Sequence, residues 1–323
     1  MLRPAHWVSG DSDRDVVLIT GCGSGLGRAL AREFYRHHEF RVAVTARSEA
    51  DLSEIRYEMP ETDRFVVLQL DVINQSERES LIAGLFSLWR AVDIVINNAG
   101  ISYRSTIEHM DEESEIHQLG VNYLAPMALI RLVIPSMRER GYGQIINVSS
   151  VSGMMAIPTM ASYSASKHAL EGATEALWYE LRPFGIKVSL IQPGFIRSNL
   201  FLKVYFSKKA KLSQDLDGPY ADYYSNMGPW IKNLMEHSTA TPEKISKKIL
   251  AICLDPYPPL WVPVTLDSVL FSFFRKVIPR CWFHQIINRF LPGVKNWGGR
   301  YRLRYKFDRI QKSESQVNKP SKL

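Results

Sequence analysis

The stretch VVLITGCGSGLG, residues 16–27, joins a short apolar run to a glycine-rich turn, and a helical pattern follows over residues 28–38. A strand, a glycine loop and a helix in this order form the setting of a dinucleotide-binding turn. Glycines let the backbone turn tightly and approach a pyrophosphate, and the N-terminus of the helix offers unpaired N–H groups and the positive end of its dipole. The alternative is a glycine-rich turn that binds no ligand.

Short apolar runs recur along the chain and alternate with helical patterns as far as Leu254. This alternation predicts an α/β protein with one parallel, doubly wound sheet. A chain of 323 residues could hold two average domains, but α/β folds of this length often form one. The expected strands are residues 16–20, 41–45, 65–70, 93–97, 144–148 and 187–191, with an edge strand at 259–263 because of its prolines.

A second group of residues fits acid–base chemistry. Ser150 follows the apolar run 144–148, while Tyr163 and Lys167 are four residues apart and so share one face of a helix. A Lys ammonium beside a phenol stabilises the phenolate, which predicts a Tyr163 pKa below the usual value of about 10. The Ser150 hydroxyl would point at a carbonyl oxygen near the phenol. Taken alone, a Tyr-x-x-x-Lys pair is also compatible with an ordinary surface helix.

Together these motifs resemble those of the short-chain dehydrogenases/reductases, from about Val16 to Leu254. The glycine spacing of residues 20–27, Thr-Gly-x-x-x-Gly-x-Gly, is the form that this family uses. Further matches are Asn97-Asn-Ala-Gly100, Leu119-Gly-Val-Asn122, Leu70-Asp-Val72 and Pro193-Gly-Phe-Ile-Arg-Ser198. Within the family, Ala165–Gly172 and Thr241-Pro-Glu243 are similar to the 17β-hydroxysteroid and retinol dehydrogenase group.

The resemblance implies a Rossmann-type fold and a role for each matching residue. The implied catalytic residues are Asn122, Ser150, Tyr163 and Lys167, and Ser150 and Tyr163 also contact the substrate. The implied cofactor-binding residues are Gly21, Ser24, Gly25, Leu26, Gly27, Arg47, Asp71, Val72, Asn98, Ala99, Gly100, Tyr163, Lys167, Pro193, Gly194, Ile196 and Ser198. Ser198 stands where Thr is more usual in the family, and it keeps the hydroxyl.

The end of the second expected strand predicts which nicotinamide cofactor is used. Family members that prefer NAD place an acidic residue there to bind the ribose 2′-hydroxyl. Here the run Val44-Thr-Ala-Arg47 contains no carboxylate, and the planar guanidinium of Arg47 suits a 2′-phosphate. We therefore predict NADP(H), with Arg28 as a weaker second source of positive charge. The alternative is that Arg47 points into solvent.

The segment from Asn199 to about His237 matches no family motif, and in the family this position holds the substrate lid. Its aromatic residues favour an apolar substrate, although they could equally cover the core; they are Phe201, Tyr205, Phe206, Tyr220, Tyr223, Tyr224 and Trp230. We therefore predict an oxidoreductase that interconverts an apolar secondary alcohol and its ketone, steroid-, retinoid- or lipid-like. The alternatives are a 3-keto lipid or 3-oxoacyl thioester reductase and a non-catalytic cofactor-binding scaffold.

The C-terminal part of the chain is strongly basic. Residues 264–323 hold thirteen Lys or Arg and three acids, a net charge of +10 against +7 for the whole chain. Bulky apolar residues are mixed with this charge from Leu266 to Leu291, which is typical of an interfacial membrane segment. Asp267, Arg275 and Lys276 interrupt the apolar stretch that a spanning helix would need. The alternatives are packing on the domain or on a homodimer partner, and nucleic-acid binding is not expected because the basic charge is confined to this tail.

These observations predict an N-terminal tail (1–14), a single dehydrogenase domain (15–263, lid about 199–237), a basic amphipathic extension (264–310) and a disordered tail (311–323). Three scattered cysteines imply no disulfide framework. Residues 1–15 lack the apolar stretch of a signal peptide, so we expect a cytoplasmic protein that is peripheral on a membrane surface if the extension binds one. The His and Cys spacings of common metal sites are missing from the sequence, and no metal is expected.

Overall fold

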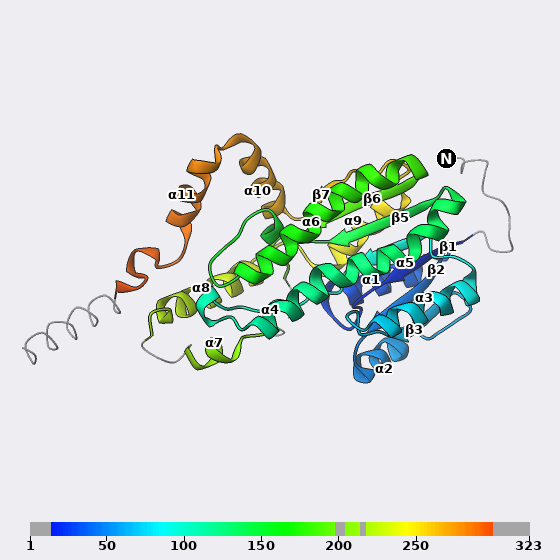
Figure 1. The fold of residues 1–323 in the computed structure, drawn as a ribbon, viewed down its shortest axis with the longest axis horizontal. Helices are drawn as coiled ribbons and strands as arrows, with labels where there is room; N and C mark the ends of the chain where they lie inside the picture. Colours follow the sequence, from blue (N-terminus) through cyan, green and yellow to red (C-terminus); the bar gives the residue numbers. More distant parts are fainter. Residues whose placement is uncertain (1–13, 198–203, 214–217, 300–323) are drawn as a thin grey trace, which may run out of the picture.

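The computed structural model describes residues 14–197, 204–213 and 218–299 (Figure 1). Seven strands form one parallel sheet in the order β3-β2-β1-β4-β5-β6-β7, so the predicted fold class is confirmed. The strands are β1 (Asp15–Ile19), β2 (Phe40–Ala46), β3 (Phe65–Gln69), β4 (Ile94–Asn97), β5 (Gly143–Val148), β6 (Ile186–Gln192) and β7 (Trp261–Pro263). Each strand expected from the sequence overlaps one of these, and the proline-flanked run is the edge strand β7.

Helices cover both faces of the sheet, which explains the continuous apolar runs. Successive strand side chains point to opposite faces, so Val17 and Ile19 belong to one buried cluster and Val16 and Leu18 to the other. The first cluster includes side chains of α1 (Gly25–Arg36), α2 (Glu49–Glu58) and α9 (Pro242–Leu254); the second includes side chains of α3 (Gln75–Trp89), α5 (Ala125–Arg140) and α6 (Ala161–Leu181).

One helical segment runs from Glu112 to Arg140 through α4 (Glu112–Leu119), the π-helical turn η2 (Gly120–Leu124) and α5. By length and composition alone it could cross a membrane. However, its Leu129 and Val133 side chains belong to the buried cluster on the sheet. This is the packing of a core helix, so the segment adds little to the case for membrane association.

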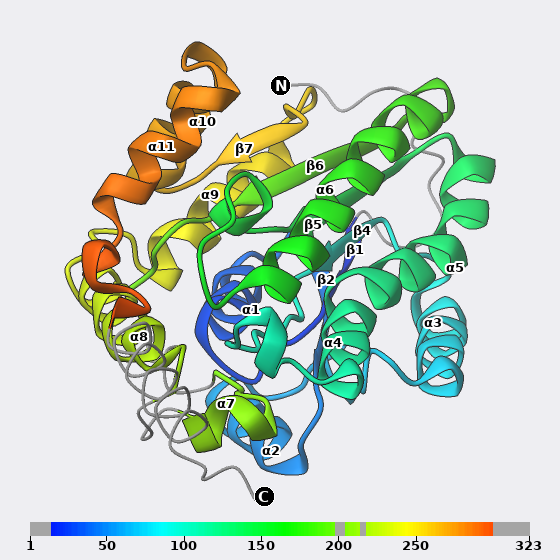
Figure 2. The same ribbon diagram turned by 60° about the vertical axis from the view of Figure 1, so that its left-hand side comes forward.

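The carboxyl ends of the strands face the part of the molecule that contains α7 (Lys208–Ser213) and α8 (Ala221–Glu236) (Figures 1 and 2). In open parallel sheets, ligands bind outside these ends, at the point where the strand order reverses. Here the reversal falls between β1 and β4, because the chain moves outward from β1 to β3 and then continues on the other side of β1. The loops after β1, β4, β5 and β6 therefore surround the candidate site.

The helices α10 (Leu266–Val277) and α11 (Arg280–Phe290) form a C-terminal arm that projects from the body (Figure 1). Its far end returns to α8: Leu291 shares a buried cluster with Met227, and the ring of Trp297 lies 4.4 Å from that of Tyr223. The end of the arm therefore packs on the domain, which was one of the alternatives for this segment. The predicted N-terminal tail, apart from Arg14, and the predicted disordered tail lie outside the described residues, as does Phe201 of the lid.

Candidate active site

The turn after β1 needs glycine at two positions. Gly21 has a φ of +72°, and a Cβ there would lie 2.7 Å from the Cα of Ala99. A Cβ on Gly27 would overlap the carbonyl oxygen of Gly21, because α1 starts directly against the turn. The N-cap residue Ser24 makes no side-chain hydrogen bond to the first turn, and this turn contains no acid. The N–H groups of residues 25–27 are therefore suited to an anion such as a pyrophosphate.

The loop after β4 closes over this glycine turn. Asn98 Nδ2 donates to the carbonyl oxygens of Thr20 at 2.9 Å and Gly21 at 3.1 Å. In return, Thr20 Oγ1 accepts from the backbone N–H groups of Asn98 and Ala99, both at 3.1 Å. The structure thus brings the predicted residues of both loops to one place.

Arg28 supports the glycine turn through hydrogen bonds to its backbone carbonyls. It is buried, and its Nε donates to the Cys22 carbonyl at 3.1 Å while a terminal nitrogen donates to the Gly23 carbonyl at 3.2 Å. Glu58 at 3.2 Å and Glu54 at 3.3 Å neutralise it. The expectation that Arg28 adds positive charge for the cofactor is therefore wrong, since its guanidinium is committed to these carbonyls and carboxylates.

Arg47 follows β2, as predicted, and its side chain is exposed. Sequence reasoning missed a nearby acid, Asp51 in the first turn of α2. A Cβ on Gly23 would lie 2.7 Å from Asp51 Cγ, so this carboxylate lies beside the glycine turn. Ser48 Oγ donates to it at 2.6 Å. Asp51 lies four residues beyond the strand end at which an acid was sought. The turn into α2 places its carboxylate beside the glycine turn.

Asp71 and Val72 lie at the carboxyl end of β3, next to β2, on the side expected for the adenine. The Asp71 N–H donates to Glu77 Oε2 at 2.7 Å, and Asp71 Oδ1 accepts from the Ile73 N–H at 3.2 Å. Val72 is buried. The turn is therefore held by its own hydrogen bonds and by α3.

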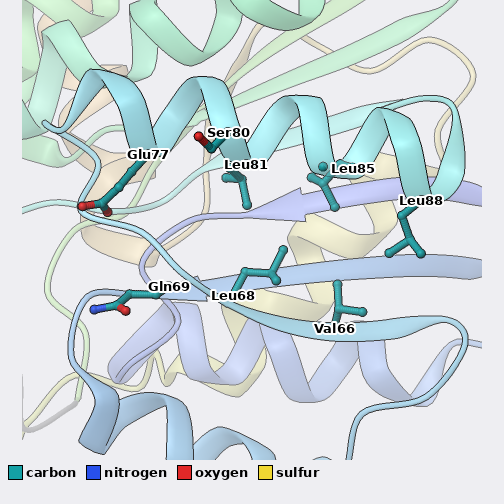
Figure 3. A pocket seen from close by; sticks show the side chains of 9 residues that line it. Val66, Leu68, Gln69, Glu77, Ser80, Leu81, Leu85 and Leu88 are labelled. Carbon is teal, nitrogen blue, oxygen red and sulfur yellow. The ribbon is translucent and has the colours of Figure 1, made fainter.

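A groove of about 370 Å³ lies beside this turn, between β3 and α3 (Figure 3). Leucine side chains from both elements, among them Leu68 and Leu81, face one another across it. Its acid, Glu77, already accepts from Asp71 and, at 2.7 Å, from Asn74 Nδ2. Three strands separate β3 from β5, so the groove is remote from the predicted catalytic residues.

The predicted catalytic residues meet at the carboxyl end of β5. Ser150 Oγ accepts from the Ser152 N–H at 3.1 Å and is hydrogen-bonded to the phenol of Tyr163 on α6. Lys167, one turn later on α6, donates to the Val148 carbonyl at 2.9 Å, and its Nζ lies 5.9 Å from the centroid of the Tyr163 ring. The spacing read from the sequence therefore places both side chains on the same side of α6.

Asn122 completes this group from the π-helical turn η2. Its amide exchanges two hydrogen bonds of 2.9 Å with the backbone of Ile101 and donates to Ser166 Oγ at 3.0 Å. A Cβ on Gly100 would lie 3.3 Å from Asn122 Oδ1 and 3.7 Å from Lys167 Nζ. Asn122 and Lys167 thus converge on Gly100, and irregular π turns are frequent at functional sites.

The pKa of Tyr163 is raised, whereas the sequence predicted that it would be lowered. Burial disfavours the phenolate, and this outweighs the hydrogen bond from Ser150 and the positive charge of Arg104. Lys167 is itself buried, and burial lowers its pKa to about 8 although Glu171 acts in the opposite direction. The predicted lowering was wrong because the spacing showed the neighbouring charge but not how strongly the surroundings of the phenol disfavour its ionised form. At neutral pH Tyr163 therefore carries its proton.

Glu171, which the sequence analysis did not single out as a site residue, fixes the strand ends behind the site. Its Oε1 accepts from Ser149 Oγ at 2.7 Å and from Gln192 Nε2 at 3.0 Å, and burial raises its pKa. The carbonyl of Pro193 accepts from the Val151 N–H at 2.7 Å. The loops after β5 and β6 are therefore held together as one unit.

The predicted nicotinamide loop is held by the start of the arm. The Gly194 N–H donates to Thr265 Oγ1 and the Phe195 N–H to Asp267 Oδ2, both at 2.8 Å. A Cβ on Gly194 would overlap the Asp267 carboxylate, so the approach is close. Ile196 packs against the core, and Ser198 lies outside the described residues. The predicted end of the dehydrogenase domain at residue 263 separates Thr265 and Asp267 from the loop that they hold. The run Thr265-Leu-Asp-Ser268 has the polar pattern of a helix N-terminus.

A pocket of about 500 Å³ lies between the loop after β4 and the lid helix α8. Its apolar lining includes Phe206, Met227 and Pro229, and Tyr163 packs against the cluster that contains Met227. Polar side chains, among them Thr159 and Ser225, form the rest of the lining. Arg104 also lines the pocket, and nothing in the local sequence pattern had marked this arginine. Within the described ranges, no group of three or more His, Cys, Asp or Glu is placed to hold a metal ion.

The chain is similar to several known proteins. The family model described as short chain dehydrogenase matches residues 15–207. Dehydrogenase/reductase SDR family member 7B of Xenopus tropicalis is 34% identical over 278 residues, which cover 83% of each chain. The 3-ketodihydrosphingosine reductase of Bacteroides thetaiotaomicron is 30% identical over 267 residues, 82% of this chain and 93% of that protein. A crystal structure of a short-chain dehydrogenase from Streptomyces avermitilis matches with a TM-score of 0.73 and 29% identity, over 87% of this chain and 99% of its own.

The link between the arm and the loop after β6 predicts that Asp267→Ala weakens binding of the nicotinamide cofactor. A hydrogen bond to a charged group is worth roughly 1.5–3 kcal/mol, so its loss should loosen the loop and reduce affinity by about tenfold. Fluorescence titration with NADPH and NADH measures this. Asp267→Asn, which keeps an acceptor oxygen, and Glu236→Ala, on the exposed side of α8, should bind nearly normally. Unchanged affinity in Asp267→Ala would show that the loop does not need the arm.

Proposed function

Because the chain belongs to the short-chain dehydrogenase family, we propose that it is an NADP(H)-dependent oxidoreductase that interconverts an apolar secondary alcohol and its ketone. The observation that carries this proposal is the convergence of Asn122, Ser150, Tyr163 and Lys167 at the carboxyl end of β5, next to a largely apolar pocket. A steroid-, retinoid- or lipid-like compound suits that pocket.

The bound nicotinamide would supply the hydride in reduction and accept it in oxidation. Ser150 Oγ and the Tyr163 phenol are hydrogen-bonded, so a substrate oxygen placed against both is held for reaction. In reduction, Tyr163 donates its proton to that oxygen as negative charge develops. Its raised pKa keeps the proton in place until then. In oxidation, the same phenol must first lose its proton and then takes one from the alcohol.

Lys167 and Asn122 would then restore the proton. With a pKa of about 8, Lys167 can release and take up a proton near neutral pH. Asn122 is held by hydrogen bonds to Ile101 and Ser166, and its Oδ1 lies near Gly100, as does Lys167 Nζ. This arrangement supports a proton path from Tyr163 through Lys167, which the resemblance to the family also implies.

Reduction of a 3-keto lipid is the second candidate. It is supported by the similarity to the 3-ketodihydrosphingosine reductase of Bacteroides thetaiotaomicron. The exposed apolar arm next to the lid offers a route by which a lipid could reach the pocket. The acid–base chemistry at Tyr163 would be the same, so the two candidates differ only in substrate.

We predict that Tyr163→Phe lowers turnover by the hundred- to ten-thousandfold that is typical when a general acid–base is lost. The substitution removes the hydroxyl and leaves the ring, so cofactor binding should persist. The assay follows reduced nicotinamide by absorbance with a panel of steroids, retinoids, aliphatic ketones and 3-keto lipids. Tyr179→Phe, on the same helix but exposed, is the matched control and should keep full activity. Near-normal turnover in Tyr163→Phe would disprove the mechanism.

The preference for NADP(H) rests on the balance of two charges. Arg47 provides an exposed guanidinium directly after β2, where the ribose 2′-position is expected. Asp51 lies beside Gly23 and opposes a second negative charge. Ser48 donates a hydrogen bond to Asp51, which reduces the effect of that carboxylate. Arg47, which has no such neutralising contact among those described, should dominate.

We predict opposite effects from the two substitutions. Arg47→Ala should weaken NADPH binding by about tenfold or more and leave NADH binding nearly unchanged, because only NADPH carries the 2′-phosphate. Asp51→Asn removes a repelling charge and should strengthen NADPH binding relative to NADH. Fluorescence titration of both cofactors gives the ratio. An unmodified protein that binds NADH as tightly as NADPH would contradict the proposal.

We further propose that the C-terminal arm attaches this otherwise cytoplasmic protein to an anionic membrane surface. The arm exposes large apolar side chains along both helices, with exposed fractions of 57% for Phe273, 64% for Trp282 and 73% for Phe290. Lys276 and Arg289 are exposed on the same helices. Apolar residues interleaved with cations are suited to the boundary between headgroups and acyl chains of anionic lipids.

We predict that the full-length protein sediments with vesicles of phosphatidylcholine and phosphatidylserine, and that salt releases only part of it. Each Lys or Arg contributes on the order of 1 kcal/mol that salt screens, whereas apolar insertion resists salt. The triple variant Phe273→Ala, Trp282→Ala, Phe290→Ala should lose the salt-resistant part. Tyr57→Ala, exposed on α2, is the control. Substitution is sharper than truncation at Pro263, which would remove Thr265 and Asp267 from the site.

If full-length protein ignores the vesicles at low salt, the membrane proposal fails. Sedimentation equilibrium then separates the remaining interpretations. A dimer that the triple variant abolishes would make the arm a homodimer surface, and a monomer in both proteins would leave it as packing surface.

A further inference from the structure

We propose that Glu171 is a positioning residue for the reaction: through Ser149 it holds Ser150 in the orientation that meets Tyr163. The proposal rests on the proposed function, because it takes Ser150 and Tyr163 as the residues that hold the reacting oxygen. It adds a residue that acts through another one, from the interior of the domain behind the strand ends.

Glu171 anchors Ser149 at the carboxyl end of β5. Its Oε1 accepts from Ser149 Oγ at 2.7 Å, and Glu171 is only 7% exposed, so water competes little for this hydrogen bond. The carboxylate is itself held in place, because the same oxygen accepts from Gln192 Nε2 at 3.0 Å and a Cβ on Gly153 would overlap it. Glu171 therefore offers Ser149 an acceptor in a fixed position.

The residues on either side of Ser149 both belong to the catalytic group. The Val148 carbonyl accepts from Lys167 Nζ at 2.9 Å, and Ser150 is hydrogen-bonded to Tyr163. Ser150 has an extended backbone, with a φ of −164° and a ψ of 161°, so its side chain points away from that of Ser149. An anchor on Ser149 behind the strand end therefore fixes the direction of the Ser150 hydroxyl on the other side.

The anchor and the phenol belong to the same rigid element. Glu171 follows Lys167 by one turn of α6, as Lys167 follows Tyr163, and the helix is continuous between them. The hydrogen bond of Glu171 thus ties the end of β5 to the helix that carries Tyr163. Since a displacement of about 1 Å can cost a hundredfold in rate, this tie matters for the alignment of Ser150 with the phenol.

Titration of Tyr163 tests the proposal without turnover. In the full-length protein, 3-fluorotyrosine takes the place of Tyr163, and its fluorine resonance follows the ionisation of this one phenol. The hydrogen bond from Ser150 lowers the pKa of Tyr163, so Ser150→Ala should move the titration midpoint to higher pH by roughly one pH unit. Glu171→Ala should move it in the same direction by about half a pH unit or more, because Ser150 is no longer held.

Two comparisons separate the hydrogen bond from the charge of the carboxylate. Glu171→Gln loses the charge but keeps an acceptor oxygen, so its midpoint should lie clearly below that of Glu171→Ala. Ser149→Ala keeps the charge and removes the donor, so its midpoint should rise, and rise no further in combination with Ser150→Ala. Glu175→Ala, one turn further along α6 and exposed, is the matched control and should titrate like the parent protein.

The other titratable and charged groups that act on Glu171 or on the phenol are the same in all these variants; they are Lys167, His168, Arg275 and Arg104. Turnover of the ketone panel gives a second readout. Glu171→Ala and Ser149→Ala should lower kcat by about ten- to a hundredfold, with smaller changes in KM and in NADPH affinity. Glu171→Gln should recover most of kcat at a pH well below the Lys167 pKa of about 8.

Three results would overturn the proposal. They are a midpoint that Ser150→Ala does not move, midpoints that stay unchanged in Glu171→Ala and Ser149→Ala, and a Glu171→Gln variant that titrates like Glu171→Ala. Ser149→Ala decides the test if Glu171→Ala fails to fold by circular dichroism. If the midpoints shift as expected but no ketone of the panel is turned over, the proposed function fails and the positioning role of Glu171 stands.

Discussion

The contact between the loop after β4 and the glycine turn after β1 is the constraint on which the site depends. Asn98 and Thr20 exchange side-chain and backbone hydrogen bonds across the point where the strand order reverses. Because Gly21 and Gly27 have no Cβ, the turn can pass close to Ala99 and α1 can begin directly behind it. The same loop continues into Gly100, where Asn122 and Lys167 meet. The nucleotide-binding turn and the acid–base residues are therefore fixed by one set of contacts.

Burial of charge sets the chemistry of the site. Lys167, Glu171 and Arg104 are all buried, and water cannot solvate them as it would at the surface. Burial lowers the pKa of Lys167 and raises that of Glu171, so it favours the uncharged form of each side chain. Arg104 keeps its charge because the pKa of an arginine starts so high. Arg104 thus favours the Tyr163 phenolate with a permanent charge, whereas Lys167 can exchange protons near neutral pH.

Much of this architecture is predictable from the sequence because it depends on local patterns. Strands buried on both faces must be apolar throughout, so they stand out as runs, and the pair Tyr163 and Lys167 is fixed by one helical turn. Arg104, Asp51 and Asp267 were not found, since each reaches the site through a contact between segments that are distant in the sequence. The direction of the Tyr163 pKa was also missed. A neighbouring charge can be read from spacing, whereas desolvation depends on everything that packs around the group.

The C-terminal arm cannot be treated as an appendage of the enzyme. Thr265 and Asp267 are its first residues and hold the backbone of Gly194 and Phe195, while Leu291 and Trp297 at its far end pack on α8. The exposed apolar residues lie between these two attachments. A force on the middle of the arm, such as insertion into a lipid surface, would therefore be transmitted to the cofactor loop at one end and to the pocket wall at the other. Since packed contacts shift between discrete arrangements rather than deform continuously, a displacement of the arm would act on the loop after β6 and on α8 together.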